Sequence, residues 1–391
     1  MGSEVIEVLA KCVEEDKDLT REDALLLAKM SADELPMLFS AALIIRLKYF
    51  RRLTTYSRKV FIPLTKMCRN QCAYCGFRVQ AKEPYMSISE AMSLVKAGER
   101  LKAKEVLVST GEKPEEVHEE ARRALKSMGY SSTLEYVRDF EERVLRETDK
   151  MMAHTNIGVL TKSEMTELRP FNASMGLMLE SISERLMERG MPHERSPSKD
   201  PKVRLRMIKE AGELRIPFTT GILIGIGETW EERVDSLIAI KRLHETYSHI
   251  QEVIIQNFMP EPGTPMSSHE PPKLLEVLKT IAIARLIFKG GIAVQAPPNL
   301  NLKAYHTYLL AGVNDWGGIS PLTPDFVNIA YPWPKIDSVR EVTEKMGFEL
   351  RERLPIYPSF IFKGWIPETL KERVENLVDE EGLVRRGEDA Y

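Results

Sequence analysis

Three cysteines lie close together in the segment Cys68-Arg-Asn-Gln-Cys72-Ala-Tyr-Cys75, with the spacing C-x₃-C-x₂-C. Thiolates are the usual ligands of iron–sulfur clusters. A cubane has four irons, so three cysteines leave one iron open to a chelating ligand such as the amine and carboxylate of an amino acid. S-adenosylmethionine (SAM) offers that pair of groups at its methionine end. The motif therefore predicts one [4Fe–4S] cluster on Cys68, Cys72 and Cys75, with SAM bound to the fourth iron.

A structural zinc site and a chance grouping of core cysteines are the alternatives. Zinc prefers four ligands in a closed tetrahedral site. The remaining cysteine, Cys12, lies in a separate segment with helical periodicity, and no histidine directly flanks the motif. Cys12 is a better candidate for the hydrophobic core. These observations favour the cluster, and they leave an iron–sulfur electron carrier or a zinc-stabilised binding protein as non-enzyme alternatives.

Composition excludes several classes of partner. The chain has 391 residues, 43% of them hydrophobic, and 55 Lys and Arg residues nearly balance 58 Asp and Glu residues. This balance gives no electrostatic footprint for nucleic acid or an anionic membrane surface. No apolar run approaches the length that spans a bilayer. We expect a soluble cytoplasmic protein that acts on a small molecule, with no nucleic-acid or membrane partner.

Short apolar runs alternate with amphipathic stretches from about Lys59 onward, which is typical of a parallel sheet covered by helices. The predicted helices are 89–101, 134–148, 201–214, 230–247 and 273–288. The predicted strands are 60–64, 105–108, 157–160, 173–179, 218–224, 252–255, 292–294 and 309–313. Eight such units predict an α/β fold, a TIM-type (β/α)₈ barrel, with an open (β/α)₆ partial barrel as the alternative. In both folds chemistry lies at the C-terminal ends of the strands, where the cysteine motif stands.

The segments on either side of the barrel differ from it in pattern. Residues 1–57 read as helices and predict an N-terminal helical extension. The barrel is expected to span residues 58–336. Residues 337–391 are charged and partly helical, and we expect them to form a C-terminal extension packed on the barrel.

The cysteine motif resembles the signature of the radical SAM superfamily, and Tyr74 before the last cysteine matches the superfamily pattern. The resemblance implies a barrel of the radical SAM type and reductive cleavage of SAM to methionine and a 5′-deoxyadenosyl radical. It also implies that Tyr74 and Phe77 lie against the adenine of SAM.

Acidic residues follow two further predicted strands. Thr110-Gly111-Glu112 resembles the superfamily's Gly-Gly-Glu motif, which grips the amino group of SAM, although Thr110 replaces the first glycine. Glu180 is a candidate for the ribose hydroxyls, with Ser181 beside it, and Arg185 is a candidate for the SAM carboxylate. A capping turn, a helix N-cap and a solvated arginine are the respective alternatives.

Glycines and an asparagine follow the fifth and sixth predicted strands. Gly225 and Gly227 belong to a GxIxGxxE pattern that resembles the adenine-contacting segment of radical SAM enzymes. Close packing of helix on strand is the alternative. Asn257 opens a proline-rich loop that also resembles an adenine-contacting segment, and a plain turn is the alternative there.

Weaker candidates for the substrate side are polar residues in or beside loops. His154 and Asn156 precede or open the third predicted strand, and Asn299, Asn314 and Asp315 lie in two later loops. Ordinary turn chemistry explains each of them equally well.

The resemblance extends from about Arg58 to about Pro334 and is strongest across Pro217–Pro265. The segments Phe61-Ile-Pro-Leu-Thr65, Asn172-Ala-Ser-Met-Gly-Leu-Met-Leu-Glu180 and Asp315-Trp-Gly-Gly318 are similar to those of the 7,8-didemethyl-8-hydroxy-5-deazariboflavin synthase family, CofG-type subunit. This implies an ammonia-releasing lyase that completes the deazaflavin chromophore of coenzyme F(420) from a 4-hydroxybenzyl adduct of a ribitylaminouracil. It also implies a CofH-type partner radical SAM subunit that makes the adduct from tyrosine, and a ferredoxin- or flavodoxin-like electron donor. The partner subunit itself and a biotin-synthase-like or menaquinone-pathway enzyme are the alternatives within the superfamily.

Overall fold

The computed structural model describes residues 2–79 and 83–387. Eight parallel strands form its centre, in the order β2-β3-β4-β5-β6-β7-β8-β1, and a further pairing of β1 with β2 closes them into a barrel. The fold is therefore the complete (β/α)₈ barrel rather than the open six-unit alternative. The strands are β1 (Leu53–Thr65), β2 (Glu105–Thr110), β3 (Met152–Asn156), β4 (Asn172–Gly176), β5 (Phe218–Ile224), β6 (Ile250–Asn257), β7 (Ala293–Gln295) and β8 (Asp315–Ile319).

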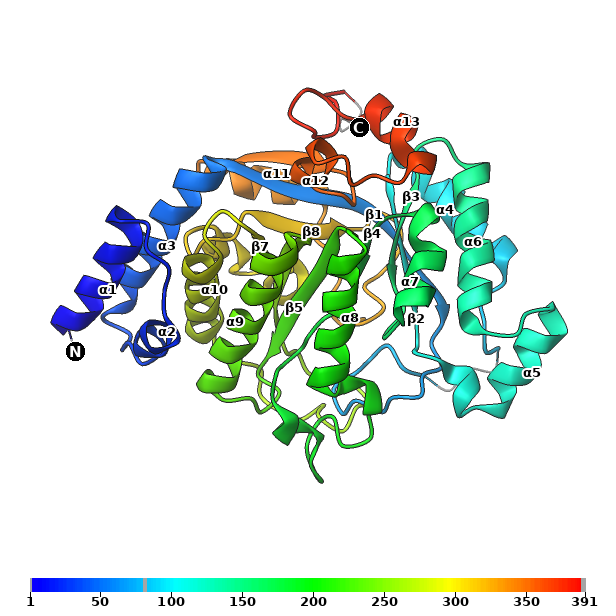
Figure 1. The fold of residues 1–391 in the computed structure, drawn as a ribbon, viewed down its shortest axis with the longest axis horizontal. Helices are drawn as coiled ribbons and strands as arrows, with labels where there is room; N and C mark the ends of the chain where they lie inside the picture. The colour runs from blue at the N-terminus through cyan, green and yellow to red at the C-terminus, as the bar shows by residue number, and fades with distance from the viewer. Residues whose placement is uncertain (1, 80–82, 388–391) are drawn as a thin grey trace.

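Helices cover the outside of the barrel (Figure 1). Those between the strands are α4 (Ile88–Arg100), α5 (Glu119–Met128), α6 (Thr133–Glu147), α7 (Lys162–Leu168), α8 (Pro201–Glu213), α9 (Trp230–Tyr247) and α10 (Leu274–Phe288). Their starts follow from capping chemistry: Thr229, for example, caps α9 through a reciprocal capping box with Glu232. No helix among the described residues is long and apolar enough to cross a membrane.

Segments at both ends of the chain extend the barrel. The helices α1 (Gly2–Glu14), α2 (Arg21–Ala28) and α3 (Leu35–Phe50) precede β1, with α3 packed against α10. At the other end lie α11 (Ile336–Lys345), α12 (Pro358–Phe362), α13 (Glu368–Leu377) and a ninth strand, β9 (Glu349–Arg353). Because β1 is long, β9 pairs in parallel with its first half while β2 pairs with its second half.

The third and eighth predicted strands are wrong in position. Residues 157–160 are a buried loop with a left-handed Gly158, and the strand lies just before them at Met152–Asn156. Residues 309–313 end a 3₁₀ turn, and the strand is Asp315–Ile319 instead. Both true strands place polar or glycine residues on the inner face, so the buried apolar run beside each strand carried the stronger hydrophobic signal.

A buried carboxyl group on α6 gives the fold a pH-dependent element. Glu141 is fully buried, its Oε1 contacts the Thr155 hydroxyl, and its Oε2 accepts a 2.6 Å hydrogen bond from Asn172 Nδ2. Thr155 Oγ1 also lies 2.7 Å from Asn172 Oδ1. One hydroxyl has one proton to donate, so a protonated Glu141 completes this network. Burial raises the pKa of Glu141 from 4.5 to about 8.

We expect the free energy of unfolding to fall as pH rises from about 4.5 to about 8, because only the folded state keeps this proton across that range. Glu141→Gln should remove this part of the dependence of the unfolding free energy on pH, since a carboxamide donates and accepts hydrogen bonds in the same place. Urea unfolding between pH 5 and pH 8.5 measures the effect, with exposed Glu142→Gln on the same helix as the control. Equal slopes in the wild-type protein and Glu141→Gln would contradict the assignment.

Candidate active site

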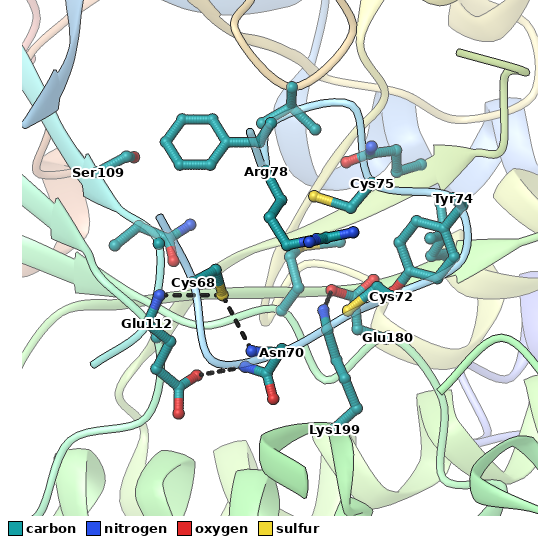
Figure 2. Close-up of a pocket in the computed structure, with 18 of the residues that line it drawn as sticks. Cys68, Asn70, Cys72, Tyr74, Cys75, Arg78, Ser109, Glu112, Glu180 and Lys199 are labelled. Carbon is teal, nitrogen blue, oxygen red and sulfur yellow. Dashed lines mark hydrogen bonds and ion pairs between the residues drawn. The ribbon is translucent and has the colours of Figure 1, made fainter. Parts of the chain in front are cut away.

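A pocket opens at the C-terminal ends of the strands, and the loop after β1 brings all three clustered cysteines to its wall (Figure 2). Its empty volume is about 1280 Å³ including the open mouth. The predicted SAM-contacting residues that line it are Tyr74, Phe77, Thr110, Gly111, Glu112, Glu180 and Asn257. Asn156 lines it as well. Residues from β1, β2, β3, β5 and β6 and from the segment after β4 thus meet in one place, as expected for the upper end of a barrel.

Backbone hydrogen bonds hold the cysteine loop against its neighbours. Arg69 N donates to Glu112 O at 3.0 Å, and Ala73 N donates to Pro192 O at 2.9 Å. Gly111 lies directly against the start of the loop, where a Cβ atom would come within 1.8 Å of Met67 O. Only glycine permits this approach, so the second position of the Thr-Gly-Glu segment has a packing role of its own.

The Cys68 sulfur accepts backbone hydrogen bonds from Asn70 N at 3.4 Å and Glu112 N at 3.2 Å. Burial raises the pKa of the Cys68 thiol to about 11, and these two hydrogen bonds oppose the rise. A thiol in this position becomes a thiolate when a metal cation supplies the compensating charge. Amide groups that point at a ligand sulfur are one means by which proteins tune iron–sulfur clusters.

The cysteine sulfurs lie around a shared space and do not converge as ligands of one ion. Among residues 2–79 and 83–387, no three His, Cys, Asp or Glu side chains are arranged to hold a single metal ion. A closed zinc site needs four ligands around one point. A cubane takes one thiolate at each of three corners, which keeps the ligand sulfurs apart.

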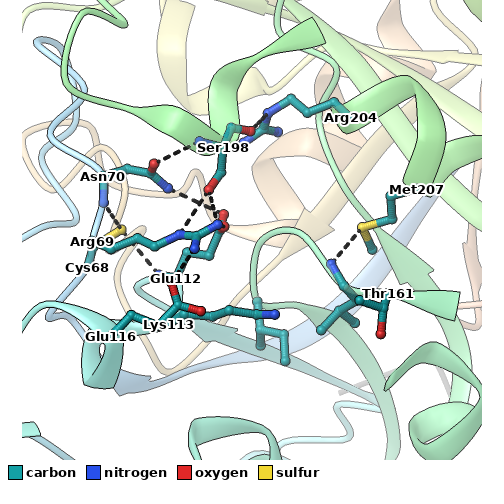
Figure 3. Close-up of polar contacts among 12 residues, drawn as sticks. Cys68, Arg69, Asn70, Glu112, Lys113, Glu116, Thr161, Ser198, Arg204 and Met207 are labelled. Carbon is teal, nitrogen blue, oxygen red and sulfur yellow. Dashed lines mark hydrogen bonds and ion pairs between the residues drawn. The ribbon is translucent and has the colours of Figure 1, made fainter. Parts of the chain in front are cut away.

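Glu112 is the centre of a buried polar network beside Cys68 (Figure 3). Its side chain is 4% exposed, and its oxygens accept hydrogen bonds from Arg69 Nη2 at 2.9 Å and Asn70 Nδ2 at 3.3 Å. Arg69 also donates to Ser198 Oγ, and Ser198 N donates to Asn70 Oδ1 at 3.2 Å. The network fixes the carboxylate at the pocket wall, and its remaining lone pairs can accept from a ligand.

Glu180 lies across the pocket and forms an ion pair with Lys199. It adopts a left-handed backbone conformation, with φ of 66°, which is uncommon for a residue with a side chain. Burial raises the pKa of Glu180, but Lys199 and Arg204 outweigh that effect and hold the pKa below its usual value. The side chain is therefore a carboxylate that accepts hydrogen bonds. Tyr74 lies near Glu180 and Lys199 (Figure 2), and its hydroxyl oxygen is 2.9 Å from His193 Nε2.

Asn257 at the end of β6 is 4% exposed and lines the pocket, and its Oδ1 has no hydrogen-bond partner. A buried unpartnered acceptor is costly unless a ligand or water satisfies it. Gly225 and Gly227 have φ values of 91° and 107°, which only glycine adopts easily. They shape the turn after β5 but do not line the pocket, and Gly225 N donates to Glu228 Oε1 at 2.9 Å.

Other predicted site residues lie outside the pocket. Arg185, a candidate for the SAM carboxylate, instead forms an ion pair with Glu232 at 2.8 Å and bonds Gly227 O. Ser181 Oγ accepts a hydrogen bond from Ser183 N in the turn after Glu180.

The late-loop candidates for the substrate side also have internal partners. Asn299 bonds Asp325 at 2.9 Å, and Asn314 Oδ1 accepts from Val294 N at 2.9 Å. Asp315 is fully buried in an ion pair with Arg353. None of these residues lines the pocket. Their polar groups instead connect loops and strands of the barrel.

Sequence reasoning missed several polar residues that do line the pocket. They are Asn70, Arg78, Ser109, Lys199, Arg204, Gln256 and Asn328. Asn70 and Arg78 could have been predicted from the sequence, since they lie within or just after the cysteine motif. Lys199 and Arg204 lie near the start of α8, and nothing in their local sequence indicates that the chain folds back across the barrel mouth there.

Comparisons with known proteins show the family to which the chain belongs. The family model described as the Radical SAM superfamily matches residues 62–239. The chain is 53% identical to the 7,8-didemethyl-8-hydroxy-5-deazariboflavin synthase of Methanopyrus kandleri over 336 residues, 85% of this chain and 100% of that relative. It is 49% identical to the synthase of the same name from Methanocaldococcus jannaschii over 335 residues, 86% of this chain and 91% of the relative.

Solved structures with low sequence identity share the fold. Methylornithine synthase superposes with a TM-score of 0.70 at 21% identity, covering 92% of this chain and 100% of that one. The FeFe-hydrogenase maturase HydG from Carboxydothermus hydrogenoformans gives a TM-score of 0.74 at 18% identity, covering 97% of this chain and 92% of that one. The match to the radical SAM family model, together with the extent and identity of the synthase relatives, shows that the chain is a radical SAM enzyme and belongs to the 7,8-didemethyl-8-hydroxy-5-deazariboflavin synthase family.

Proposed function

We propose that this enzyme converts 5-amino-5-(4-hydroxybenzyl)-6-(D-ribitylimino)-5,6-dihydrouracil to 7,8-didemethyl-8-hydroxy-5-deazariboflavin in coenzyme F(420) biosynthesis. Ammonia, 5′-deoxyadenosine and methionine leave. The observation that carries this proposal is the meeting of Cys68, Cys72 and Cys75 with Glu112 and Glu180 at one pocket of a radical SAM barrel. A CofH-type subunit would supply the adduct, and a ferredoxin- or flavodoxin-like protein would supply electrons.

The pocket residues fit a [4Fe–4S] cluster and SAM. Three thiols share one wall, and Cys68 already accepts two amide hydrogen bonds. The unpartnered Asn257 Oδ1 suits an amino group such as that of adenine. When bound, the reduced cluster and SAM supply the radical that removes a hydrogen atom from the substrate.

The protein's own residues bind and orient SAM. In this proposal the Glu112 carboxylate accepts from the amino group of SAM and Glu180 accepts from the ribose hydroxyls. Tyr74 and Phe77 provide aromatic surface for the adenine, and the barrel wall keeps water away from the reacting carbon. Buried carboxylates fixed by internal partners lose little side-chain entropy when they bind.

A product assay tests the proposed reaction. Protein prepared without oxygen, reconstituted with iron and sulfide, and given reductant, SAM and the adduct should form the fluorescent deazaflavin together with 5′-deoxyadenosine. Activity on tyrosine plus the free ribitylaminouracil, with none on the adduct, would assign the chain to the partner reaction instead. One zinc per chain with no sulfide would support the zinc-stabilised alternative.

We expect Glu112→Gln to weaken SAM binding about tenfold, or about 1.4 kcal/mol, because a charge-assisted hydrogen bond becomes a neutral one. Iron content should stay near that of the wild-type protein. The matched control is Glu116→Gln, since Glu116 pairs with the same Arg69 but is 48% exposed and lies outside the pocket. Loss of iron with unchanged SAM affinity in the remaining holoenzyme would show that Glu112 only supports the cysteine loop.

A further inference from the structure

The interior of the barrel continues below the pocket toward His154, whose Nδ1 has a hydrogen-bond partner and whose Nε2 has none among the described residues. Side chains at alternate positions of a strand share one face, so His154 faces the same interior as Asn156, which lines the pocket. Its Nδ1 lies 2.7 Å from Ser174 Oγ on β4. A Cβ atom at Gly176, two residues farther along β4, would lie 2.9 Å from Nε2. The ring thus runs along β4 with Nε2 nearer the pocket, in space that the absent side chain of Gly176 leaves free.

Hydrogen bonding fixes the protonation pattern of this ring. Ser174 Oγ donates its one proton to Pro355 O at 2.6 Å, so it accepts from His154 Nδ1–H. Nε2 is then an unprotonated acceptor, and no described residue donates to it. Burial lowers the pKa of His154 to about 4, which keeps the ring neutral at pH 7.

Apolar side chains around the histidine remain accessible inside the barrel. Leu107, the register partner of His154 on β2, is only partly buried, and so is Ile254 on β6, which lines the pocket. His154 itself is 7% exposed. The interior at the level of His154 is therefore not completely filled by side chains.

A lysine and a glutamate lie two residues deeper in the register, on β1 and β2. Lys59 faces the interior two residues before Phe61, which lines the pocket, and Glu105 is its register partner. Lys59 is 8% exposed, its Nζ lies 5.8 Å from the Phe61 ring centroid and 4.7 Å from that of Trp333, and no described carboxylate is within ion-pair distance. A buried ammonium group without a carboxylate partner is unusual, and a ligand acceptor would satisfy it.

Given the proposed function, we propose that His154, Lys59 and Glu105 form the subsite for the ribityl hydroxyl groups of the substrate. A hydroxyl group both donates and accepts, so it can donate to His154 Nε2 or Glu105 and accept from Lys59. A single hydroxyl satisfies at most part of this set, whereas a polyol offers several. The reacting rings stay beside the SAM site in the pocket, and the tail extends into the interior below it.

Equilibrium binding of two probes tests this subsite. The probes are the deazaflavin product and its 10-methyl analogue, which keeps the rings and lacks the polyol, and their fluorescence reports binding to the SAM-loaded holoenzyme. His154→Leu and Lys59→Met should each weaken binding of the ribityl probe about tenfold and change binding of the methyl probe less than twofold. His154→Gln, which can present a carboxamide oxygen near the position of Nε2, should recover most of the ribityl affinity.

Equal weakening of both probes would place the rings at this level, and no weakening of either would remove the subsite; both results overturn the inference. Iron content and SAM affinity of each variant show whether the fold is intact, and Lys59→Met tests the subsite from another strand if His154→Leu does not fold. Failure of the proposed function is a separate result, because it appears as wild-type protein that does not convert the adduct, whatever the two probes do.

Discussion

Replacing Cys68, Cys72 or Cys75 with alanine is expected to abolish both SAM cleavage and deazaflavin formation. All three side chains line the same pocket wall, and a cubane that keeps one iron open for SAM has no spare protein ligand. Loss of any thiolate leaves a second iron without a protein ligand, so cluster and SAM site are lost together. Iron and sulfide content, the visible absorption of the cluster and 5′-deoxyadenosine formation under reducing conditions measure the effect.

Cys12→Ala is the matched control for this series. Cys12 is the remaining cysteine of the chain, is 1% exposed in α1, and packs within the hydrophobic core. We expect this variant to keep its iron, its sulfide and its turnover, with some loss of stability from the smaller core side chain. Near-normal turnover by any of the other three variants, or loss of iron in Cys12→Ala, would place the cluster elsewhere.

The barrel could be predicted from the sequence where hydrophobic pattern and capping agree. Phe218–Ile224 and Trp230–Tyr247 have the bounds that the sequence predicts, because a glycine turn and a capping box separate a continuous apolar strand from an amphipathic helix. The prediction failed for β3 and β8, where the interior of the barrel accepts His154, Asn156 or the glycines of Asp315–Ile319. A strand whose inward-facing residues are polar or glycine lacks the run of apolar residues on which strand prediction depends.

The site divides in the same way. Short-range motifs predicted that the cysteines, Glu112 and Glu180 belong to one site, and these residues do line one pocket because each follows the end of a strand. Lys199 and Arg204 could not be found, since their places depend on how the segment between β4 and α8 folds back over the barrel. Arg185 shows the opposite failure. Its spacing after Glu180 predicted a contact with the SAM carboxylate, but its guanidinium forms an ion pair with the Glu232 carboxylate instead.

Asp315 gives the largest stability effect that we expect outside the cluster site. Its carboxylate accepts two hydrogen bonds from Arg353, from Nε at 2.7 Å and from Nη2 at 2.9 Å, and one from Gly317 N at 2.6 Å. Arg353 belongs to β9 and also pairs with Glu252 at 3.1 Å, so the three residues join β6, β8 and β9. All of them are buried. Removing the Asp315 carboxylate leaves the buried Arg353 guanidinium without sufficient compensation.

We expect Asp315→Asn to lower the free energy of unfolding by about 3–5 kcal/mol. The control, Glu349→Gln, breaks an ion pair with Arg386 whose side chains are 51% and 71% exposed, and it should cost about 0–1 kcal/mol. Urea unfolding of the reconstituted protein gives both values. The same variants decide between the two roles proposed for this residue. If Asp315→Asn unfolds at the wild-type urea concentration but loses deazaflavin formation, then Asp315 serves the substrate, and the buried pair with Arg353 does not explain its presence in the eighth strand.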